Sequence, residues 1–179
     1  MARVILLLRG INVGGRNKLP MATLREHLEQ LGGSEVTTYV QSGNAVLNLS
    51  TSQAKTIDAT LSQAIARDQG FEPRVLCLTA AELLAAIEQN PFPQADDAPT
   101  TVHVSFLERE PAAGAEAELN TLRAASERFT LQGRVFYLHA PDGIGRSRLA
   151  SRAESAFGCP ATSRNWRTVR ALEALLPAG

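Results

Sequence analysis

The stretch VTTYVQSGNAVLNL, residues 36–49, decides the fold class of this 179-residue chain. It contains two strand-like runs, 36–41, which is rich in β-branched residues, and 44–49, which is rich in apolar residues, with only Ser42 and Gly43 between them. A tight, glycine-containing link between two such runs is typical of a β-hairpin, whose two strands are antiparallel. The sequence therefore predicts an antiparallel sheet at this place and does not indicate a parallel one.

Segments on both sides of this hairpin complete one structural unit. A short apolar run at 3–8 predicts a buried strand, and apolar residues at helical spacing predict a helix from Pro20 to Gly32. After the hairpin, we expect a helix that ends at Gly70 and a further strand at 73–78. The resulting order of elements is βαββαβ, followed by one more helix.

The same order of elements returns in the second half of the chain. A strand with clear alternation covers 101–107, two strands are joined across Gly133, and a short strand is expected within 159–163. Ser147 and Asn165 are expected to cap the last two helices. Two βαββαβ units with antiparallel sheets make an α+β fold, a tandem duplication of the ferredoxin-like unit. We therefore predict a first unit at 1–89, a linker rich in proline and aspartate at 90–100, and a second unit at 101–179.

The composition excludes several classes of protein. Eighteen basic and eighteen acidic side chains give a formal net charge of zero, so no bulk field draws the chain to nucleic acid or to an acidic membrane. Cys77 and Cys159 match neither a disulfide framework nor a zinc site. No apolar run approaches the ~20 residues that span a bilayer, and the N-terminus has no cleavage motif of a signal peptide. We therefore expect a cytoplasmic protein that neither holds a metal nor enters a membrane.

The loop after the first predicted strand, GINVGGRN at 10–17, is a near match to a phosphate-binding loop. Arg16 stands where that pattern has a lysine, and Asn17 stands where it has a hydroxyl that holds magnesium. The following helix begins at Pro20, after the glycines rather than through them. Two interpretations stay open, a loop that only turns the chain and a nest of backbone N–H groups for an anion.

Basic side chains gather in two segments, 1–25 and 134–170, on either side of an acidic segment at 71–127. In a ferredoxin-like sheet, the loop after the first strand and the hairpin meet at one end. The unusual segments of the second unit, 141–149 and 162–166, share the opposite end of their own sheet. If the units pack so that all these segments line one cleft, glycine amides and helix N-termini would attract an anion there. The predicted ligand-binding residues are Arg9, Asn12, Gly14, Gly15, Arg16, Gln41, Ser42, Asn44, Arg146, Ser147, Arg148, Arg164 and Asn165.

No catalytic constellation is evident in the sequence. His27 is expected on the exposed face of a helix, and His103 and His139 are expected to have structural roles within strands. A carboxylate pair, a histidine–cysteine arrangement and a metal-ligand spacing are all missing. The sequence therefore identifies no catalytic residue and no cofactor, and it leaves open whether the protein is an enzyme.

Five motifs, in this order along the chain, resemble the DUF1697 family of bacterial proteins. They are LLRGINVGGRNKLPMATLREHLEQLG, TYVQSGNAVLN, NPFP, GIGRSRL and TSRNWRTV. The resemblance covers almost the whole chain and implies a duplicated, ferredoxin-like fold. It implies no function, because the family is a domain of unknown function.

Three functions from different classes are compatible with the sequence. The first is binding of a small anionic ligand, such as a nucleotide or a phosphorylated metabolite, in the cleft between the units. The second is a nucleic-acid binding module. It is less favoured because stacking aromatics are missing from the first and third strands of the expected sheets, and the near candidates Tyr39, Phe136 and Tyr137 cannot all be exposed by strand alternation. The third is an interaction scaffold without a ligand. No motif indicates an oligomeric state.

Overall fold

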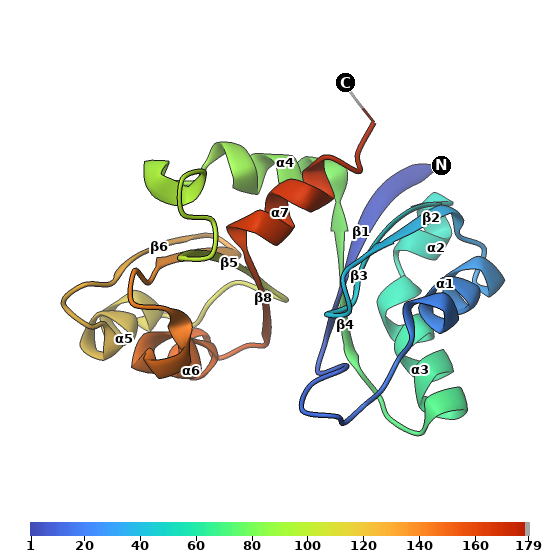
Figure 1. Cartoon of the computed structure of the whole chain (residues 1–179), viewed down its shortest axis with the longest axis horizontal. Coiled ribbons are helices and arrows are strands. Elements are labelled where there is room, and N and C mark those ends of the chain that lie inside the picture. Colours follow the sequence, from blue (N-terminus) through green and yellow to red (C-terminus); the bar gives the residue numbers. More distant parts are fainter. Residues whose placement is uncertain (178–179) are drawn as a thin grey trace. The chain divides into compact units, whose positions relative to one another are not determined.

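Each half of the chain forms a four-stranded antiparallel sheet in the computed structural model, which describes residues 1–177 (Figure 1). The strand orders are β2-β3-β1-β4 and β6-β7-β5-β8, so the first strand of each half is central in its sheet. This order is that of the ferredoxin-like unit, and the predicted duplicated α+β fold is confirmed.

The elements of the first half follow the predicted order. They are β1 (Ala2–Arg9), α1 (Met21–Gln30), β2 (Ser34–Tyr39), β3 (Asn44–Leu49), α2 (Thr51–Ala54), α3 (Ile57–Gln69), β4 (Arg74–Thr79) and α4 (Ala80–Glu88). The second half repeats this order. Its elements are η1 (Pro93–Ala95), β5 (Val102–Leu107), α5 (Ala115–Leu122), β6 (Arg128–Gln132), β7 (Val135–His139), η2 (Ile144–Arg146), α6 (Arg148–Phe157), β8 (Ala161–Asn165) and α7 (Trp166–Glu173).

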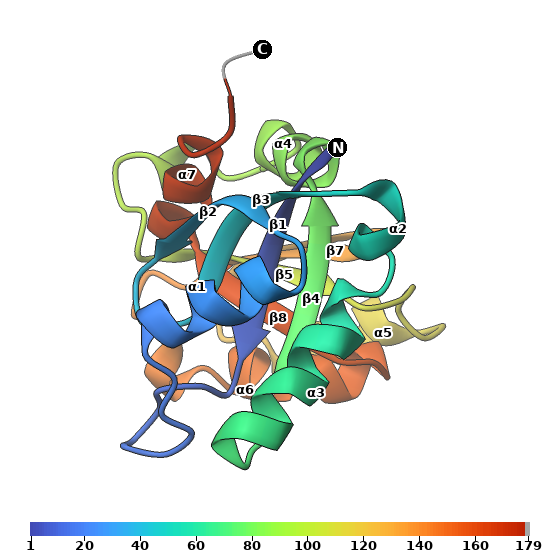
Figure 2. The ribbon, with the colours of Figure 1, turned by 90° about the vertical axis from the view of Figure 1, so that its right-hand side faces the viewer.

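The core of the first unit lies between its sheet and the helices α1 and α3, which stand in front of the strands in Figure 2. Val4, Leu6 and Leu8 of β1 point into this core, together with Leu28 of α1 and Leu61 of α3. The alternate residues of β1 are buried as well, and Ile5 and Leu7 are 0% exposed. Because both faces of β1 are buried, its sequence is a continuous apolar run rather than an alternating one.

Two predicted strands shift along the chain. The predicted strand at 36–41 is observed at Ser34–Tyr39, because Val40 adopts a φ of 50° that turns the chain into the hairpin link. The strand predicted within 159–163 is observed at Ala161–Asn165, where Ala161 pairs with Leu107 and Asn165 with His103. Arg164 therefore lies within a strand rather than in a loop after it.

The second core lies under α5 and α6. Phe136 of β7 is 1% exposed and meets Phe157 of α6 edge to face, with 5.1 Å between the ring centroids. Ser147 caps α6 as predicted, since its side chain accepts a hydrogen bond from the Ala150 N–H, and Gly158 ends the helix in the left-handed region. These caps fix both ends of α6 on the sheet.

Residues 90–100, predicted as a linker, are a packed segment of the second unit. Phe92 lies 5.8 Å from the ring of His139, and the Trp166 indole N–H donates to Asp96 over 2.8 Å. Just before this segment, the Tyr137 hydroxyl donates to the Ala86 carbonyl oxygen over 2.8 Å. Residues 86–100 therefore cover the face of the second sheet that is opposite α5 and α6.

The described chain forms two compact units. The first unit contains Met1–Ala85 and also the described residues from Ala171 onward, and the second contains Ala86–Arg170. Arg3 connects the late segment to the first sheet, because its guanidinium donates to the Leu175 carbonyl oxygen over 3.2 Å. In the described part of the chain, every helix is too short or too polar to cross a membrane.

Burial of Tyr137 generates a prediction about alkaline pH. The Tyr137 side chain is 0% exposed, and burial raises the pKa of its hydroxyl to about 12 from an ordinary value of about 10. The folded state therefore keeps this proton after the unfolded state has lost it. We expect the stability contributed here to be complete below about pH 10 and to be lost as the pH rises through about 12.

The measurement is urea unfolding of the wild type and Tyr137→Phe at several pH values between about 9 and 11. At the lower pH, the variant should be destabilised by about 1–3 kcal/mol because the buried Ala86 carbonyl loses its donor. The difference from wild type should shrink as the pH rises. Tyr39→Phe is the matched control, because the Tyr39 hydroxyl lies outside this contact, and an equal effect of both substitutions would contradict the prediction.

Candidate functional site

The glycine loop and the hairpin of the first unit meet at the same end of the sheet. The Leu8 N–H donates to the Gly43 carbonyl oxygen over 2.7 Å, and the Asn12 amide donates to the Gln41 carbonyl oxygen over 2.8 Å. The two segments lie together because β1 and β2 run in the same direction and end on the same side. The predicted ligand-binding residues at positions 9–16 therefore lie next to those at positions 41–44.

Asn12 holds this loop in shape. Its Nδ2 donates to the carbonyl oxygens of Leu19 and Gln41, over 2.9 and 2.8 Å, and its Oδ1 accepts from the Leu19 N–H over 2.8 Å. Asn17 has a similar role, since its Nδ2 donates to the Gly10 carbonyl oxygen over 2.8 Å. Both asparagines adopt a positive φ, which their short side chains tolerate. Asn12 has both amide hydrogens engaged, so its observed role is structural.

Asn44 has the same kind of role in the hairpin. The residue is 0% exposed, and its Nδ2 donates to the Tyr39 carbonyl oxygen and to the Ser42 hydroxyl, over 3.0 Å in each case.

The part of the 10–17 loop that faces solvent is its tip. Val13 pairs with Arg16 in an isolated bridge, and Gly14 and Gly15 turn the chain between them.

The geometry differs from that of a nucleotide-hydrolysing phosphate loop. In such a loop the glycines lead directly into a helix whose N-terminus points at the phosphates. Here α1 begins at Met21, after Pro20, and the glycine turn is closed by the Val13–Arg16 bridge. The interpretation of 10–17 as a variant phosphate loop on a helix N-terminus is therefore not supported by the fold.

In the second unit, a pocket of about 400 Å³ lies between the C-terminal end of α5 and the N-terminal end of α6. We call it the α6 pocket. It brings together three of the sequence-predicted residues with an arginine from the α5 end. Its lining residues are Thr121, Leu122, Arg123, Ala124, Ser126, Glu127, Ala140, Asp142, Gly143, Arg146, Ser147 and Arg148.

Charges in the α6 pocket are three arginines and two carboxylates. The two carboxylates are engaged with the loop between α5 and β6: Glu127 accepts from the Ala124 N–H over 2.9 Å, and Asp142 accepts from the Ser126 hydroxyl over 2.7 Å. Arg123 donates to the backbone carbonyl oxygen of Glu127 over 2.9 Å. Basic side chains therefore outnumber acidic side chains in the α6 pocket.

Sequence reasoning missed Arg123. It stands in the acidic segment 71–127, and nothing in the pattern of α5 distinguishes it from other solvated arginines. Its position at the end of α5 depends on where the α5–β6 connection folds back, which no local motif specifies.

Arg164 and Asn165 do not line the α6 pocket, although their strand ends at the same end of the sheet as β7. Asn165 caps α7, because its Oδ1 accepts from the Thr168 N–H over 3.0 Å. Arg164 pairs with Val104 on the sheet face opposite α5 and α6, and its guanidinium donates to the Ser163 carbonyl oxygen over 2.8 Å. Burial lowers the pKa of Arg164 to about 10, so the side chain is still a cation at neutral pH.

The histidines do not form a catalytic group. His27, expected on an exposed helix face, is only 5% exposed, because the face of α1 that carries it packs toward α3, and its Nδ1 lies 3.6 Å from the Asp68 carboxylate. Burial lowers the pKa of His103, and a hydrogen bond with the Thr101 backbone acts in the other direction by raising it. The Nδ1 of His139 lies 3.0 Å from the Gln94 amide. Over residues 1–177, histidine, cysteine and acidic side chains form no group of three that could hold a metal.

Two ferredoxin-like units of the same topology define the fold class of the protein. The chain belongs to the DUF1697 family, described as "Protein of unknown function (DUF1697)", whose family model matches residues 1–137. Among solved structures, it is similar to that of the conserved bacterial protein SP0830 from Streptococcus pneumoniae, with 24% sequence identity and a TM-score of 0.76. That match covers 98% of this chain and 99% of the other, and it shows a shared fold. Comparison with curated proteins gives no match.

The close approach of the loop and the hairpin generates a second prediction. A Cβ on Gly43 would lie 2.6 Å from the Ile11 Cδ1 and 2.8 Å from the Leu8 Cβ, at a φ of +82°. Gly14 also has a positive φ, of +58°, but a Cβ there meets no atom within 4 Å. Gly14→Ala should cost about 1 kcal/mol of stability for the backbone alone. Gly43→Ala should cost about 1–3 kcal/mol more, because Ile11 and Leu8 must move.

Equilibrium unfolding of the two variants beside the wild type measures this difference. The pair separates backbone strain from steric overlap, since both substitutions place alanine at a positive φ. Equal losses of stability in the two variants would show that the loop does not pack on the hairpin in solution.

Proposed function

We propose that this protein binds a small anionic ligand of the phosphate class, and that the α6 pocket receives the anionic group. The observation that carries the proposal is the convergence of Arg123, Arg146 and Arg148 on the N-terminal end of α6. The pocket volume of about 400 Å³ lies within the range of small-molecule sites, about 300–1,000 Å³.

The first turn of α6 supports this proposal. Ser147 accepts hydrogen bonds from the N–H groups of Ala150 and Ser151, through its side chain and its carbonyl respectively. The remaining N–H groups of the first turn belong to Arg148 and Leu149, and a helix start leaves such groups for a cap, water or a ligand. The partial positive charge of a helix N-terminus favours an anion in the same place as the arginines do.

Not all sequence-predicted residues enter this proposal. Asn12 and Asn44 have their amide hydrogens engaged within the first unit, which favours a structural role for them. Ligand contacts by Arg9, Arg16 and Arg164 stay predictions.

Nucleic-acid binding is less well supported. Ferredoxin-like domains that bind RNA stack bases on exposed aromatic side chains of the open sheet face. On that face of the first sheet, β1 and β3 carry Ile5, Leu7 and Val46 rather than aromatics. In the second sheet, the aromatic residue Tyr137 is buried, and its hydroxyl donates a hydrogen bond to the Ala86 carbonyl oxygen.

Thermal-shift measurements with inorganic phosphate, pyrophosphate and sugar phosphates test the proposal. Arg146→Ala or Arg148→Ala should remove a charge-assisted contact of about 1.5–3 kcal/mol. This loss corresponds to roughly ten- to a hundredfold weaker binding. Stability without ligand should stay close to that of the wild type, because both side chains are exposed.

Arg152→Ala is the matched control, since Arg152 is an exposed arginine of the same helix that does not line the pocket. The control should keep the wild-type response to each anion. The proposal fails if no anion shifts the wild-type melting temperature, or if Arg152→Ala weakens the response as much as the two pocket variants do.

A further inference from the structure

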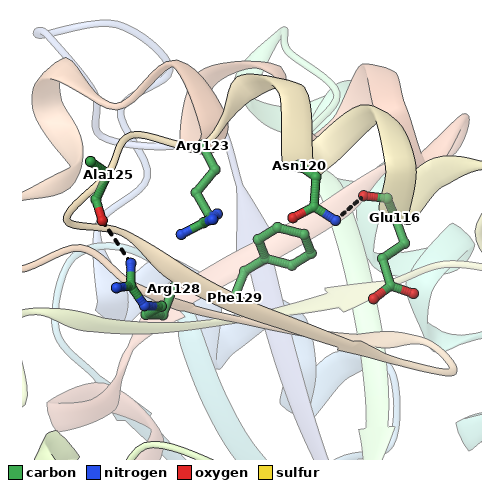
Figure 3. Close-up of a pocket in the computed structure, with 6 residues that line it drawn as sticks. All are labelled: Glu116, Asn120, Arg123, Ala125, Arg128 and Phe129. Carbon is green, nitrogen blue, oxygen red and sulfur yellow. Dashed lines mark hydrogen bonds between the residues drawn. The ribbon is translucent and has the colours of Figure 1, made fainter.

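We infer a second ligand site on the second unit, at the edge of its sheet, for a planar aromatic ring that carries one oxyanion. The site is a shallow hollow of about 490 Å³ between α5 and the edge strand β6 (Figure 3). We call it the arginine shelf. Its lining residues are Glu116, Asn120, Arg123, Ala125, Arg128 and Phe129. This inference goes beyond the proposed function, although Arg123 lines both pockets.

Two arginines of the shelf are held by the same backbone oxygen. Arg123 donates through Nη1 to the Glu127 carbonyl oxygen over 2.9 Å, and Arg128 donates through Nη1 to that same oxygen over 2.7 Å. Arg128 also donates to the Ala125 carbonyl oxygen over 2.7 Å. Both guanidinium groups are therefore fixed in place, and the two positive charges lie close together.

No acid neutralises this pair within the described chain. The ion pairs and remaining contacts of residues 1–177 give neither Arg123 nor Arg128 a carboxylate within ion-pair distance. The carboxylate of Glu127 is turned to the Ala124 N–H instead. One arginine would suffice to hold the Glu127 carbonyl, and the second adds a repulsion between like charges that an oxyanion would relieve. Guanidinium groups suit this task because each can present two parallel donors to an oxyanion.

Phe129 gives the shelf an aromatic surface beside these charges. Its ring lies between Arg123 and Asn120 in Figure 3, and it is only partly buried. On its inner side the ring is held by Phe136, with 5.7 Å between the ring centroids. A ring fixed on one side and open on the other offers a planar ligand an offset or edge-to-face contact.

The end of the arginine shelf that is farthest from the two arginines carries an amide oxygen and a carboxylate. Asn120 donates through Nδ2 to the Glu116 carbonyl oxygen over 3.1 Å, which leaves its Oδ1 toward the hollow. The Glu116 carboxylate lies beyond Phe129, on the side away from the two arginines (Figure 3). A ligand with its oxyanion at the arginines and a ring over Phe129 fits this polarity, whereas a second negative charge at the Glu116 end would be repelled.

Phenyl phosphate is the probe that tests this inference, with cyclohexyl phosphate and inorganic phosphate as comparison ligands. Titrations of the whole chain followed by NMR should move the amide signals of Asn120 and Phe129. Phenyl phosphate should bind about tenfold more tightly than cyclohexyl phosphate, because only the planar ring gains the contact with Phe129.

Variants of the shelf sharpen the test. Arg128→Ala and Arg128→Gln should each weaken phenyl phosphate binding by about tenfold or more, and the glutamine keeps a donor for the Ala125 carbonyl while removing the charge. Phe129→Leu should abolish the preference for the phenyl over the cyclohexyl ring. Glu116→Gln should strengthen binding by a few-fold, since it removes a negative charge from the far end.

Arg148→Ala distinguishes this site from the α6 pocket, because Arg148 does not line the shelf. If phenyl phosphate binding survives Arg148→Ala and is lost in the Arg128 variants, the shelf is the site. If Arg148→Ala abolishes it and the Arg128 variants retain it, the ring ligand occupies the α6 pocket, so the inference is overturned while the proposed function stands. Absence of any shift at Asn120 and Phe129 would also overturn it.

Discussion

The first strand of each unit is hydrogen-bonded to a neighbouring strand on both sides. In the first unit, the burial of this strand limits where charged side chains can lie. β1 lies between β3 and β4, and its residues from Val4 to Leu8 are at most 1% exposed. A strand that is buried on both faces can carry no charged group without a partner. The charged residues of β1, Arg3 and Arg9, therefore lie near its two ends, and the Gly10–Asn17 loop, the α6 pocket and the arginine shelf all lie outside this strand.

The two units share a topology but use it differently. In the first, the glycines and asparagines follow the first strand, and Asn12 fastens that loop to Leu19 and to the hairpin. In the second, the basic residues gather around α5, α6 and the edge strand β6. Duplicated folds commonly carry different sites, because function depends on residues added to a fold rather than on the fold itself.

The sequence predicted the fold well and the candidate site only in part. Local signals sufficed for the hairpin, for Gly70 as a helix end, and for Ser147 as a cap, because each depends on a few adjacent residues. The end of β2 was misplaced because a β-branched residue, Val40, turns the chain at a positive φ. Arg123 and Arg128 could not be found from the sequence. Their significance arises only when both guanidinium groups reach one carbonyl oxygen, that of Glu127.

The return of the chain to the first unit has a consequence for its synthesis. The described residues from Ala171 onward pack with the first unit, where Arg3 donates to the Leu175 carbonyl oxygen, so the second unit is an insertion between residues 85 and 171. The first unit therefore lacks a part of its final packing until the segment that begins at Ala171 has been synthesised. Domains usually fold in order from the N-terminus as they leave the ribosome. In this protein, the second unit can complete its packing before the first, because the first unit still needs the segment that begins at Ala171.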